Sequence, residues 1–199
     1  MLDVSNGGGE SDAILSVRSV AKSFGGVQAV KEVSLDVERG SIFSIIGPNG
    51  AGKTSLVNMI SGFYKADQGS ITFDGTELIG KRPSQIAEQG IARTFQNIAL
   101  FHGLTVLDNL MLGRHVRMKS GILSSILYWG AAQKEEVEHR KRAEEIIDFL
   151  RITDLRRMTT GELAYGLQKR VELGRALALD PTLLLLDEPM AGMNQEEKE

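Results

Sequence analysis

A glycine-rich stretch early in the chain has the residue types that bind phosphate groups. Residues 47–54 read Gly-Pro-Asn-Gly-Ala-Gly-Lys-Thr and fit the pattern G-x-x-x-x-G-K-[ST]. Glycines let successive backbone N–H groups point at phosphate oxygens, and the lysine adds a charge for the β- and γ-phosphates. The next two hydroxyls can bind Mg²⁺ and the α-phosphate. The predicted nucleotide loop comprises Gly47, Pro48, Asn49, Gly50, Ala51, Gly52, Lys53, Thr54 and Ser55.

Two carboxylates follow an apolar run near the end of the sequence. Residues 183–186 are all leucine, and Asp187 and Glu188 come directly after them. Ligands of parallel sheets bind at the carboxyl ends of the strands, where these two side chains would lie. We expect Asp187 to hold Mg²⁺, directly or through water, and Glu188 to act as the general base for an attacking water. The alternative is an acidic loop without chemistry, but a phosphate loop in the same chain favours the catalytic interpretation.

The elements around these groups alternate between strands and helices. The apolar run 41–46 predicts a strand covered on both faces, and it leads directly into the glycine loop. This context favours nucleotide binding over a turn that binds nothing. The alternation predicts an α/β fold with a helical insert at about residues 100–178. Expected strands are 14–20 (an edge strand), 33–37, 41–46, 70–74, 91–95 and 182–187, and expected helices are 53–61, 84–88, 105–112, 133–150 and 166–177.

Composition excludes several classes of protein. Lys and Arg total 23 against 26 Asp and Glu, and a net charge of −3 argues against a dedicated nucleic-acid binder. The chain has no cysteine, which excludes disulfides, thiolate metal sites and a cysteine nucleophile. No apolar run approaches the roughly 18 residues that cross a bilayer. Residues 1–12 have neither a basic start nor an apolar stretch, so we expect a flexible leader rather than a signal peptide.

Four further features, in order along the chain, complete the pattern. Phe24 lies in Lys-Ser-Phe-Gly, Gln96 lies in Arg-Thr-Phe-Gln-Asn, and residues 163–168 read Leu-Ala-Tyr-Gly-Leu-Gln. Residues 191–194, Ala-Gly-Met-Asn, follow the acidic pair. Together with the phosphate loop these motifs resemble the ATP-binding subunit of ABC transporters, over about residues 14–199. The four features match the family's adenine-stacking aromatic, Q-loop glutamine, signature and D-loop, respectively.

The resemblance implies a P-loop NTPase fold with a largely parallel core sheet, an antiparallel β edge and a helical subdomain. It implies ATP and Mg²⁺, with Thr54, Gln96 and Asp187 at the metal. The catalytic residues would be Lys53, Gln96 and Glu188. The signature would contact ATP bound to a partner subunit. Its residues are Leu163, Ala164, Tyr165, Gly166, Leu167 and Gln168.

The same resemblance implies partners and a location. A second ATPase subunit, identical or different, would pair head to tail with this one, and membrane-spanning permease subunits would receive the motion. A solute-binding protein would act indirectly, and nucleic acid is not an expected partner. The subunit would lie on the cytoplasmic face of the plasma membrane, peripherally. An apolar patch around Ile126, Tyr128 and Trp129 is a candidate contact with the permease, or it packs on its own domain.

Finer features resemble one branch of the family. The runs Arg-Thr-Phe-Gln-Asn-Ile (93–98) and Thr-Val-Leu-Asp-Asn-Leu (105–110), the long segment 113–144 and the Leu-Ala-Tyr-Gly signature are similar to branched-chain amino acid transporters. Urea and amide importers share much of this pattern. The signature departs from the family consensus: Ala164 replaces a serine, Tyr165 a glycine and Leu167 a glutamine. Lys169 and Arg170 are expected to add positive charge nearby.

Two alternatives stay open at this point. A non-transport ABC ATPase that acts on DNA or ribosomes would usually carry two cassettes or coiled-coil arms, which this chain lacks. The family also has a switch histidine beyond its D-loop, whereas His102, His115 and His139 all precede the signature. We expect His102 and His139 at ordinary polar positions and His115 at the surface, at a helix end. We therefore expect domain 13–199 to be truncated before that element, and a module that binds nucleotide without turnover stays open.

Overall fold

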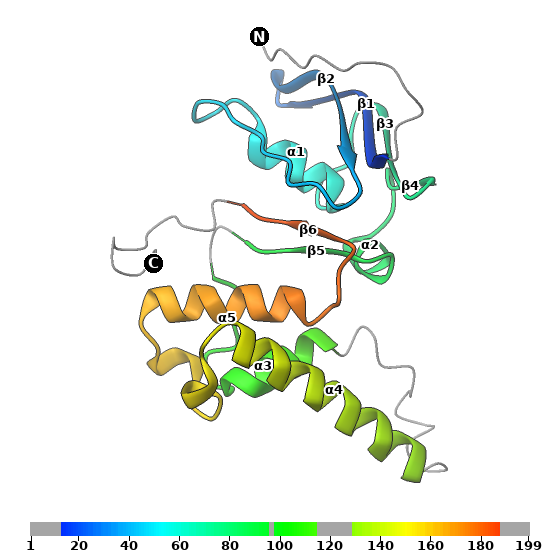
Figure 1. The fold of residues 1–199 in the computed structure, drawn as a ribbon. Coiled ribbons are helices and arrows are strands. Elements are labelled where there is room, and N and C mark those ends of the chain that lie inside the picture. The colour runs from blue at the N-terminus through cyan, green and yellow to red at the C-terminus, as the bar shows by residue number, and fades with distance from the viewer. Residues whose placement is uncertain (1–12, 96–97, 115–128, 188–199) are drawn as a thin grey trace. The chain divides into compact units, whose positions relative to one another are not determined.

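A computed structural model of the chain describes residues 13–95, 98–114 and 129–187, except for the side chains of 129–132. The chain forms two compact units, residues 1–86 and residues 87–199. Elements are labelled in Figure 1. The phosphate loop belongs to the first unit, whereas the acidic strand end and the signature belong to the second.

The first unit contains a four-stranded antiparallel sheet in the order β2-β1-β3-β4. The strands are β1 (Ala13–Phe24), β2 (Val27–Glu38), β3 (Gln68–Phe73) and β4 (Thr76–Glu77). Gly25 and Gly26 join the first two strands with φ of +52° and +85°, the positive values that a tight hairpin turn requires. The expected edge strand at 14–20 is wrong in one respect, because β1 pairs on both sides. Its alternation reports burial of one face and carries no information about the number of partners.

Two helices complete this part of the chain. Helix α1 (Lys53–Ile60) buries Leu56, Met59 and Ile60, and α2 (Pro83–Glu88) buries Ile86. Both confirm helices expected from the sequence. The chain turns at Gly62, with φ of +76°, directly after α1.

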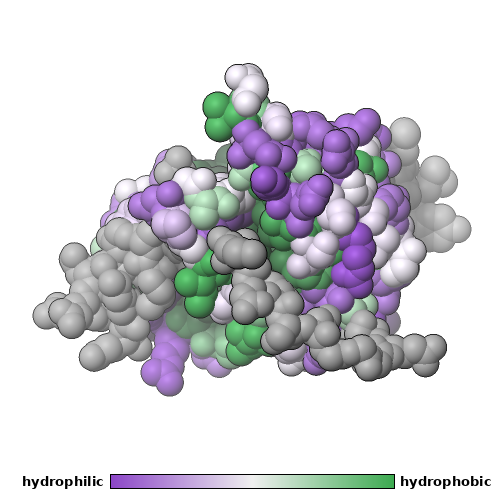
Figure 2. Space-filling view, turned by 90° about the horizontal axis from the view of Figure 1, so that it is seen from above, coloured by the Kyte–Doolittle hydropathy of each residue, from purple (hydrophilic) through white to green (hydrophobic). Residues whose placement is uncertain are grey.

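The strand expected at residues 41–46 is not formed in the structure. Residues 41–48 have neither helix nor strand, and Ile42 and Ile46 are 98% and 81% exposed. Apolar side chains reach the surface among hydrophilic ones in the view of Figure 2. The physical reason for the difference is that a strand needs a hydrogen-bonding neighbour, and none of the described strands pairs with this segment. Hydropathy predicted burial and a place in a sheet for this segment, and the structure shows neither among the described residues.

The second unit has a parallel strand pair and a group of helices. Strands β5 (Ile91–Arg93) and β6 (Leu183–Leu185) pair in parallel, with Ile91 opposite Leu183. The helices are α3 (Val106–Arg114), α4 (Trp129–Phe149) and α5 (Tyr165–Leu177), with short 3₁₀ turns η2 (Thr153–Leu155) and η3 (Thr160–Glu162). These confirm the expected strands and helices, although β5 and β6 are shorter than the runs that predicted them. The buried core that joins the helices comprises Leu100, Val106, Leu107, Leu110, Ala143, Ile146, Ile147, Ile152, Leu163, Val171 and Ala178. No helix in the described ranges is both long and apolar enough to cross a bilayer.

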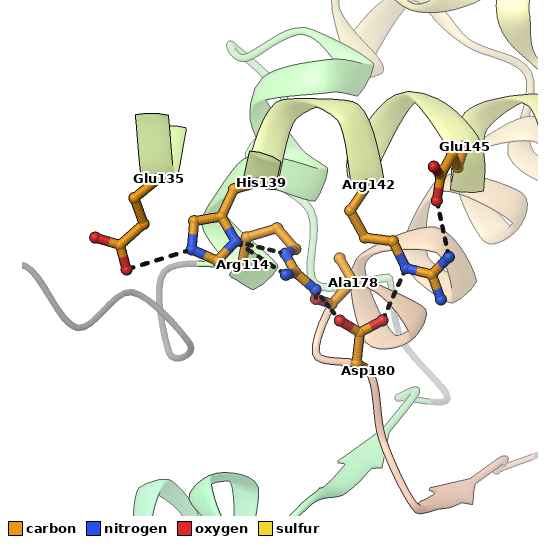
Figure 3. A network of polar contacts seen from close by, with 7 residues as sticks. All are labelled: Arg114, Glu135, His139, Arg142, Glu145, Ala178 and Asp180. Carbon is orange, nitrogen blue, oxygen red and sulfur yellow. Dashed lines mark hydrogen bonds and ion pairs between the residues drawn. The ribbon is translucent and has the colours of Figure 1, made fainter. Parts of the chain in front are cut away.

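A polar network joins the C-terminal ends of α3 and α5 to the middle of α4 (Figure 3). Arg114, buried at the end of α3, donates to His139 Nδ1 on α4 from Nε at 3.1 Å, and to the Ala178 carbonyl at 2.9 Å. It also pairs with Asp180, which accepts a second bond from Arg142 Nε at 2.9 Å. Nδ1 of His139 accepts from Arg114, and Nε2 on the other side of the ring lies 3.7 Å from Glu135 Oε1. His139 is therefore a buried part of the helix junction, and the expectation of an ordinary polar position was wrong.

Substitution of Asp180 by asparagine should weaken the second unit in a pH-dependent way. Burial opposes ionisation of this carboxyl, but hydrogen bonds from Arg114 and Arg142 outweigh it and lower its pKa below the ordinary 3.8. A carboxyl with a lowered folded-state pKa stabilises the fold above its unfolded pKa, and that contribution disappears as pH falls through the folded value. We expect a loss of about 1 kcal/mol at pH 7, modest because solvent screens a side chain that is 38% exposed.

Urea unfolding at pH values from 7 down to about 3.5 measures this difference. The gap between wild type and Asp180→Asn should narrow as the pH falls below about 4. Asp154→Asn, at an exposed aspartate in η2, is the matched control and should show no pH-dependent gap. A gap for Asp180→Asn that is constant across this range would contradict the assignment.

Candidate functional site

The phosphate loop curls through two left-handed glycines before α1 begins. Gly50 and Gly52 have φ of +83° and +89°, and Ala51 N–H donates to the Pro48 carbonyl at 3.2 Å. Helix α1 starts at Lys53, directly after the loop. The first N–H groups of a helix have no partner within it, and the helix dipole makes that end positive. The loop therefore ends at a helix terminus suited to an anion.

The backbone of β2 leaves no room for a side chain at Gly52. A Cβ atom placed there would lie 2.3 Å from the Ala29 carbonyl oxygen and 3.1 Å from Val30 Cγ2. A Cβ atom placed at Gly50 would meet no other atom within 4 Å. Two glycines of one motif thus serve different needs, since Gly50 requires only the left-handed conformation and Gly52 also requires the absence of Cβ.

Lys53 closes the loop through its own side chain. Its Nζ donates to the carbonyls of Gly47 and Pro48 at 2.7 and 2.9 Å. Carbonyls are neutral acceptors, and hydrogen bonds between an ammonium and an ionised phosphate are roughly twice as strong. A phosphate group in the loop could therefore draw Nζ to itself. The hydroxyl side chains of Thr54 and Ser55 lie in the first turn of α1, Thr54 exposed and Ser55 half-buried.

An aromatic pair lies in the same unit. The ring of Phe24, at the end of β1, is 41% exposed, and Tyr64 meets it edge-on at 5.0 Å between centroids. Lys22 Nζ lies 5.4 Å from the Phe24 centroid and pairs with Asp67 at 2.7 Å. Hydrogen bonds from Lys22 and from Ser23 N–H lower the pKa of Asp67. Neighbours thus hold the Phe24 ring while part of it stays open to a flat ligand.

Sequence reasoning did not identify Tyr64. The chain turns at Gly62 after α1, and the Tyr64 N–H donates to the Asn58 carbonyl at 3.1 Å. This turn places Tyr64 against Phe24. The aromatic pair Phe63-Tyr64 after a helix-ending glycine was the available signal. These two residues do not indicate that Tyr64 contacts Phe24, which lies 40 positions earlier in the sequence.

In the second unit, Asp187 forms a buried ion pair with Arg93. Arg93 Nη2 lies 3.1 Å from Asp187 Oδ2, and each side chain is 8% exposed. Thr94 N–H donates to the Leu185 carbonyl at 3.0 Å and continues the β5–β6 pairing toward this edge. The aspartate expected at the metal thus has its carboxylate oriented by an arginine of the neighbouring strand. In the sequence, Arg93 stands out only as part of the motif Arg-Thr-Phe-Gln-Asn, which does not predict this contact.

Removal of the arginine should destabilise the second unit strongly. In Arg93→Met, the buried Asp187 carboxylate loses its ion-pair partner, which typically costs about 3 kcal/mol or more. The double variant Arg93→Met/Asp187→Leu removes both charges and should recover much of that loss. Urea unfolding of the single and double variants measures both effects. Equal stability of wild type and Arg93→Met would show that the pair contributes nothing to the fold.

The signature lies at the start of α5. The helix begins at Tyr165, and Ala164 precedes it in an extended conformation with φ of −58° and ψ of 153°. The Gln168 side chain folds back and donates to the Leu163 carbonyl at 2.9 Å. Gly166 is buried and Tyr165 is exposed. The helix start that could face phosphate is therefore formed, as expected.

Lys169 was expected to add positive charge near the signature, and the structure shows that this expectation is wrong. Its side chain is buried and contacts the Glu172 carboxylate at 3.3 Å, which neutralises it. It is a core charge of the second unit and adds little positive potential at the surface. The i, i+3 spacing of the two residues was visible in the sequence, but their burial was not.

Several expected site residues lie outside the described residues. These are Gln96, Glu188 and the D-loop residues 191–194, together with Ile126, Tyr128 and the Trp129 side chain. Their roles stay predictions, as does a shared Mg²⁺ between Thr54 and Asp187. A hydroxyl, an amide and a carboxylate supply the hard oxygen ligands that Mg²⁺ prefers, alongside phosphate oxygens. Within the described ranges, no three His, Cys, Asp or Glu residues gather as a separate metal site.

A family model described as "ABC transporter" matches residues 30–191. This match includes the phosphate loop, the signature and Asp187. The chain belongs to the ABC transporter family. As a member, it is an ATP-hydrolysing subunit coupled to transport.

Curated relatives and solved structures agree with this membership. The branched-chain amino acid transport ATP-binding proteins LivG of Salmonella typhimurium and BraF of Pseudomonas aeruginosa are 39% and 38% identical to this ABC protein, covering 94% of its chain and 73% of theirs. An ABC transporter ATP-binding cassette crystallised in its ADP conformation matches with a TM-score of 0.78 and 38% identity, over 94% of this chain and 72% of that one. CbiO1 of Clostridium perfringens matches with a TM-score of 0.76 and 29% identity, over 94% and 70%. These similarities confirm the P-loop NTPase fold class.

Proposed function

We propose that this ABC subunit hydrolyses ATP to drive the import of branched-chain amino acids. The observation that carries the proposal is the 38–39% identity, over nine-tenths of the chain, to branched-chain amino acid transport ATP-binding proteins. The loop geometry agrees with it, because Gly50, Gly52 and Lys53 form a curled backbone and a closing ammonium ahead of a helix terminus.

In the proposed mechanism, two subunits pair head to tail around ATP. The loop residues Gly47–Ser55 of one subunit bind the phosphates, Phe24 stacks on adenine, and the signature helix of the partner faces the γ-phosphate. Because the γ-phosphate bridges the two subunits, closure of the pair depends on it. Glu188 takes a proton from the attacking water, and Gln96 orients that water. Loss of the γ-phosphate then releases the pair.

The proposed site includes ligands for Mg²⁺. Thr54, Gln96 and Asp187 are the residues that would hold it. When bound, the ion neutralises charge on the β- and γ-phosphates. In the described residues, Arg93 already restrains the Asp187 carboxylate, so the fold presents one ligand in a defined orientation.

The proposed assembly includes membrane-spanning permease subunits and, indirectly, a solute-binding protein. The second ATPase subunit is either a copy of this chain or a related one. The whole would place this subunit on the cytoplasmic face of the plasma membrane as a peripheral component. Closing and opening of the ATPase pair would be transmitted to the permease through the helical subdomain.

Reconstituted transport tests the proposed substrate. Proteoliposomes that contain the subunit, its permease partners and the binding protein should accumulate labelled leucine only with ATP. Lys53→Ala is the control without ATP turnover and should abolish uptake. Uptake of urea or short amides in place of leucine would overturn the proposed substrate while leaving the ATPase role intact.

A further inference from the structure

Helix α5 carries two buried charged residues that belong neither to the nucleotide loop nor to the signature. Lys169 and Glu172 are 6% and 2% exposed, and their Nζ and Oε2 atoms lie 3.3 Å apart. Two charges in the interior are rarely more stabilising than an apolar pair of the same volume. Their hydrogen bonds to the backbone of other residues explain their presence better.

Both charges bind the backbone of Phe95. Lys169 Nζ donates to the Phe95 carbonyl at 2.9 Å. The N–H of the same residue donates to Glu172 Oε1 at 3.2 Å. The ion pair therefore satisfies both polar groups of one residue, which fixes its backbone against α5.

The helix holds Ala99 in the same manner. The Ala99 N–H donates to Glu172 Oε1 at 3.4 Å, and the Ala99 carbonyl accepts from Arg175. Residues 169, 172 and 175 follow one another at intervals of three and so share one face of the helix. One helical face thus binds the backbone of the chain at two points, four residues apart.

Gln96 lies in the sequence between these two points. The same helix begins at Tyr165, next to Ala164 of the signature. We propose that Lys169 and Glu172 are positioning residues for Gln96, because they bind the backbone of Phe95 and Ala99, on either side of it in the sequence, to the helix that carries the signature. This inference rests on the proposed role of Gln96 in ATP hydrolysis. The pair acts through the Phe95 and Ala99 backbone and does not itself touch the nucleotide.

The chemistry of the pair makes the proposal specific. Glu172 Oε1 accepts from two N–H groups while Oε2 faces the ammonium. In Glu172→Gln the shape is kept, but one end of the amide is a donor. That donor must face either the Lys169 ammonium or the two backbone N–H groups, so one attachment is lost in either orientation.

Steady-state ATPase kinetics of the assembled transporter test the proposal. Glu172→Gln should lower kcat about tenfold and leave the KM for ATP within about twofold, since the nucleotide loop is untouched. Lys169→Met should do the same, and Lys169→Arg, which keeps charge and donors, should retain most of the activity. Arg114→Met is the matched control: it removes a buried, paired cation at the end of α3, and should also lower Tm but leave kcat unchanged.

A double-mutant cycle with Gln96→Ala separates positioning from general loss of structure. If Glu172 acts through Gln96, Glu172→Gln should reduce kcat by less than about twofold in the Gln96→Ala background. Losses of kcat that multiply in the double variant, or an equal loss of kcat in Arg114→Met, would overturn the positioning role alone. A wild-type rate for Gln96→Ala would overturn the proposed role of Gln96 and the positioning role together.

Discussion

Replacement of Glu188 by glutamine should stop ATP hydrolysis by the assembled transporter while ATP binding persists. The residue directly follows Asp187, whose carboxylate is fixed by Arg93 at the end of β6. Glutamine keeps the size of the side chain but cannot accept the proton of the attacking water. Loss of a general base typically lowers the rate by about 10²–10⁴-fold. Phosphate release measures the rate, and binding of a fluorescent ATP analogue measures the retained affinity.

The trapped state provides a second readout for the same variant. Because ATP is not consumed, its γ-phosphate should keep the two ATPase subunits paired, and size-exclusion chromatography with ATP should show more of the closed pair. Glu136→Gln, at an exposed position on α4, is the matched control and should hydrolyse at the wild-type rate. If the Glu188→Gln transporter hydrolysed ATP at the wild-type rate, another group would be the base.

Gly52→Ala should abolish nucleotide binding by the first unit. The added methyl group would lie 2.3 Å from the Ala29 carbonyl oxygen, and the residue would also be held at a φ of +89°. The left-handed conformation alone costs an alanine about 1–2 kcal/mol. The contact with backbone adds about 1–3 kcal/mol of overpacking, because a strand carbonyl cannot rotate away as a flexible side chain would. The loop must shift, and its N–H groups leave the positions that converge on phosphate.

A matched glycine separates the contact from the conformational strain. Gly40 has a φ of +72°, and a methyl group added there would meet nothing within 4 Å, so Gly40→Ala introduces only the strain. We expect Gly40→Ala to bind ATP normally with a stability loss of about 1–2 kcal/mol. Isothermal titration with ATP and urea unfolding measure the two quantities. Normal ATP affinity in Gly52→Ala would show that the β2 contact does not shape the loop.

The order of the motifs along the chain indicates most of the function without the fold. The pattern of residues 47–54 requires specific side chains at specific spacings, so it identifies phosphate chemistry directly. Helices α1, α3, α4 and α5 were also predictable, because a 3.6-residue period is a property of the local sequence. The signature helix α5 was expected from Gly166 and starts one residue earlier, at Tyr165.

Partnership between distant residues was not predictable in this way. β1 was expected at an edge and has a neighbour on each side, and the apolar segment 41–46 was expected in a sheet and is unpaired among the described strands. Hydrogen bonds between strands join residues far apart in the chain, and hydropathy does not identify the partner of a strand. Tyr64 beside Phe24 and Arg93 beside Asp187 escaped sequence reasoning for the same reason.

The sequence by itself determined the phosphate loop and the acidic strand end, because each consists of neighbouring residues. It also determined the family, because the motifs occur in a specific order along the chain. Only the tertiary structure decided how buried charges are used. His139 and Lys169 look like surface residues in the sequence, yet Arg114 contacts one and Glu172 the other in the interior of the second unit. A charge enters the interior only when partners from other elements compensate it, and those partners are brought together by folding.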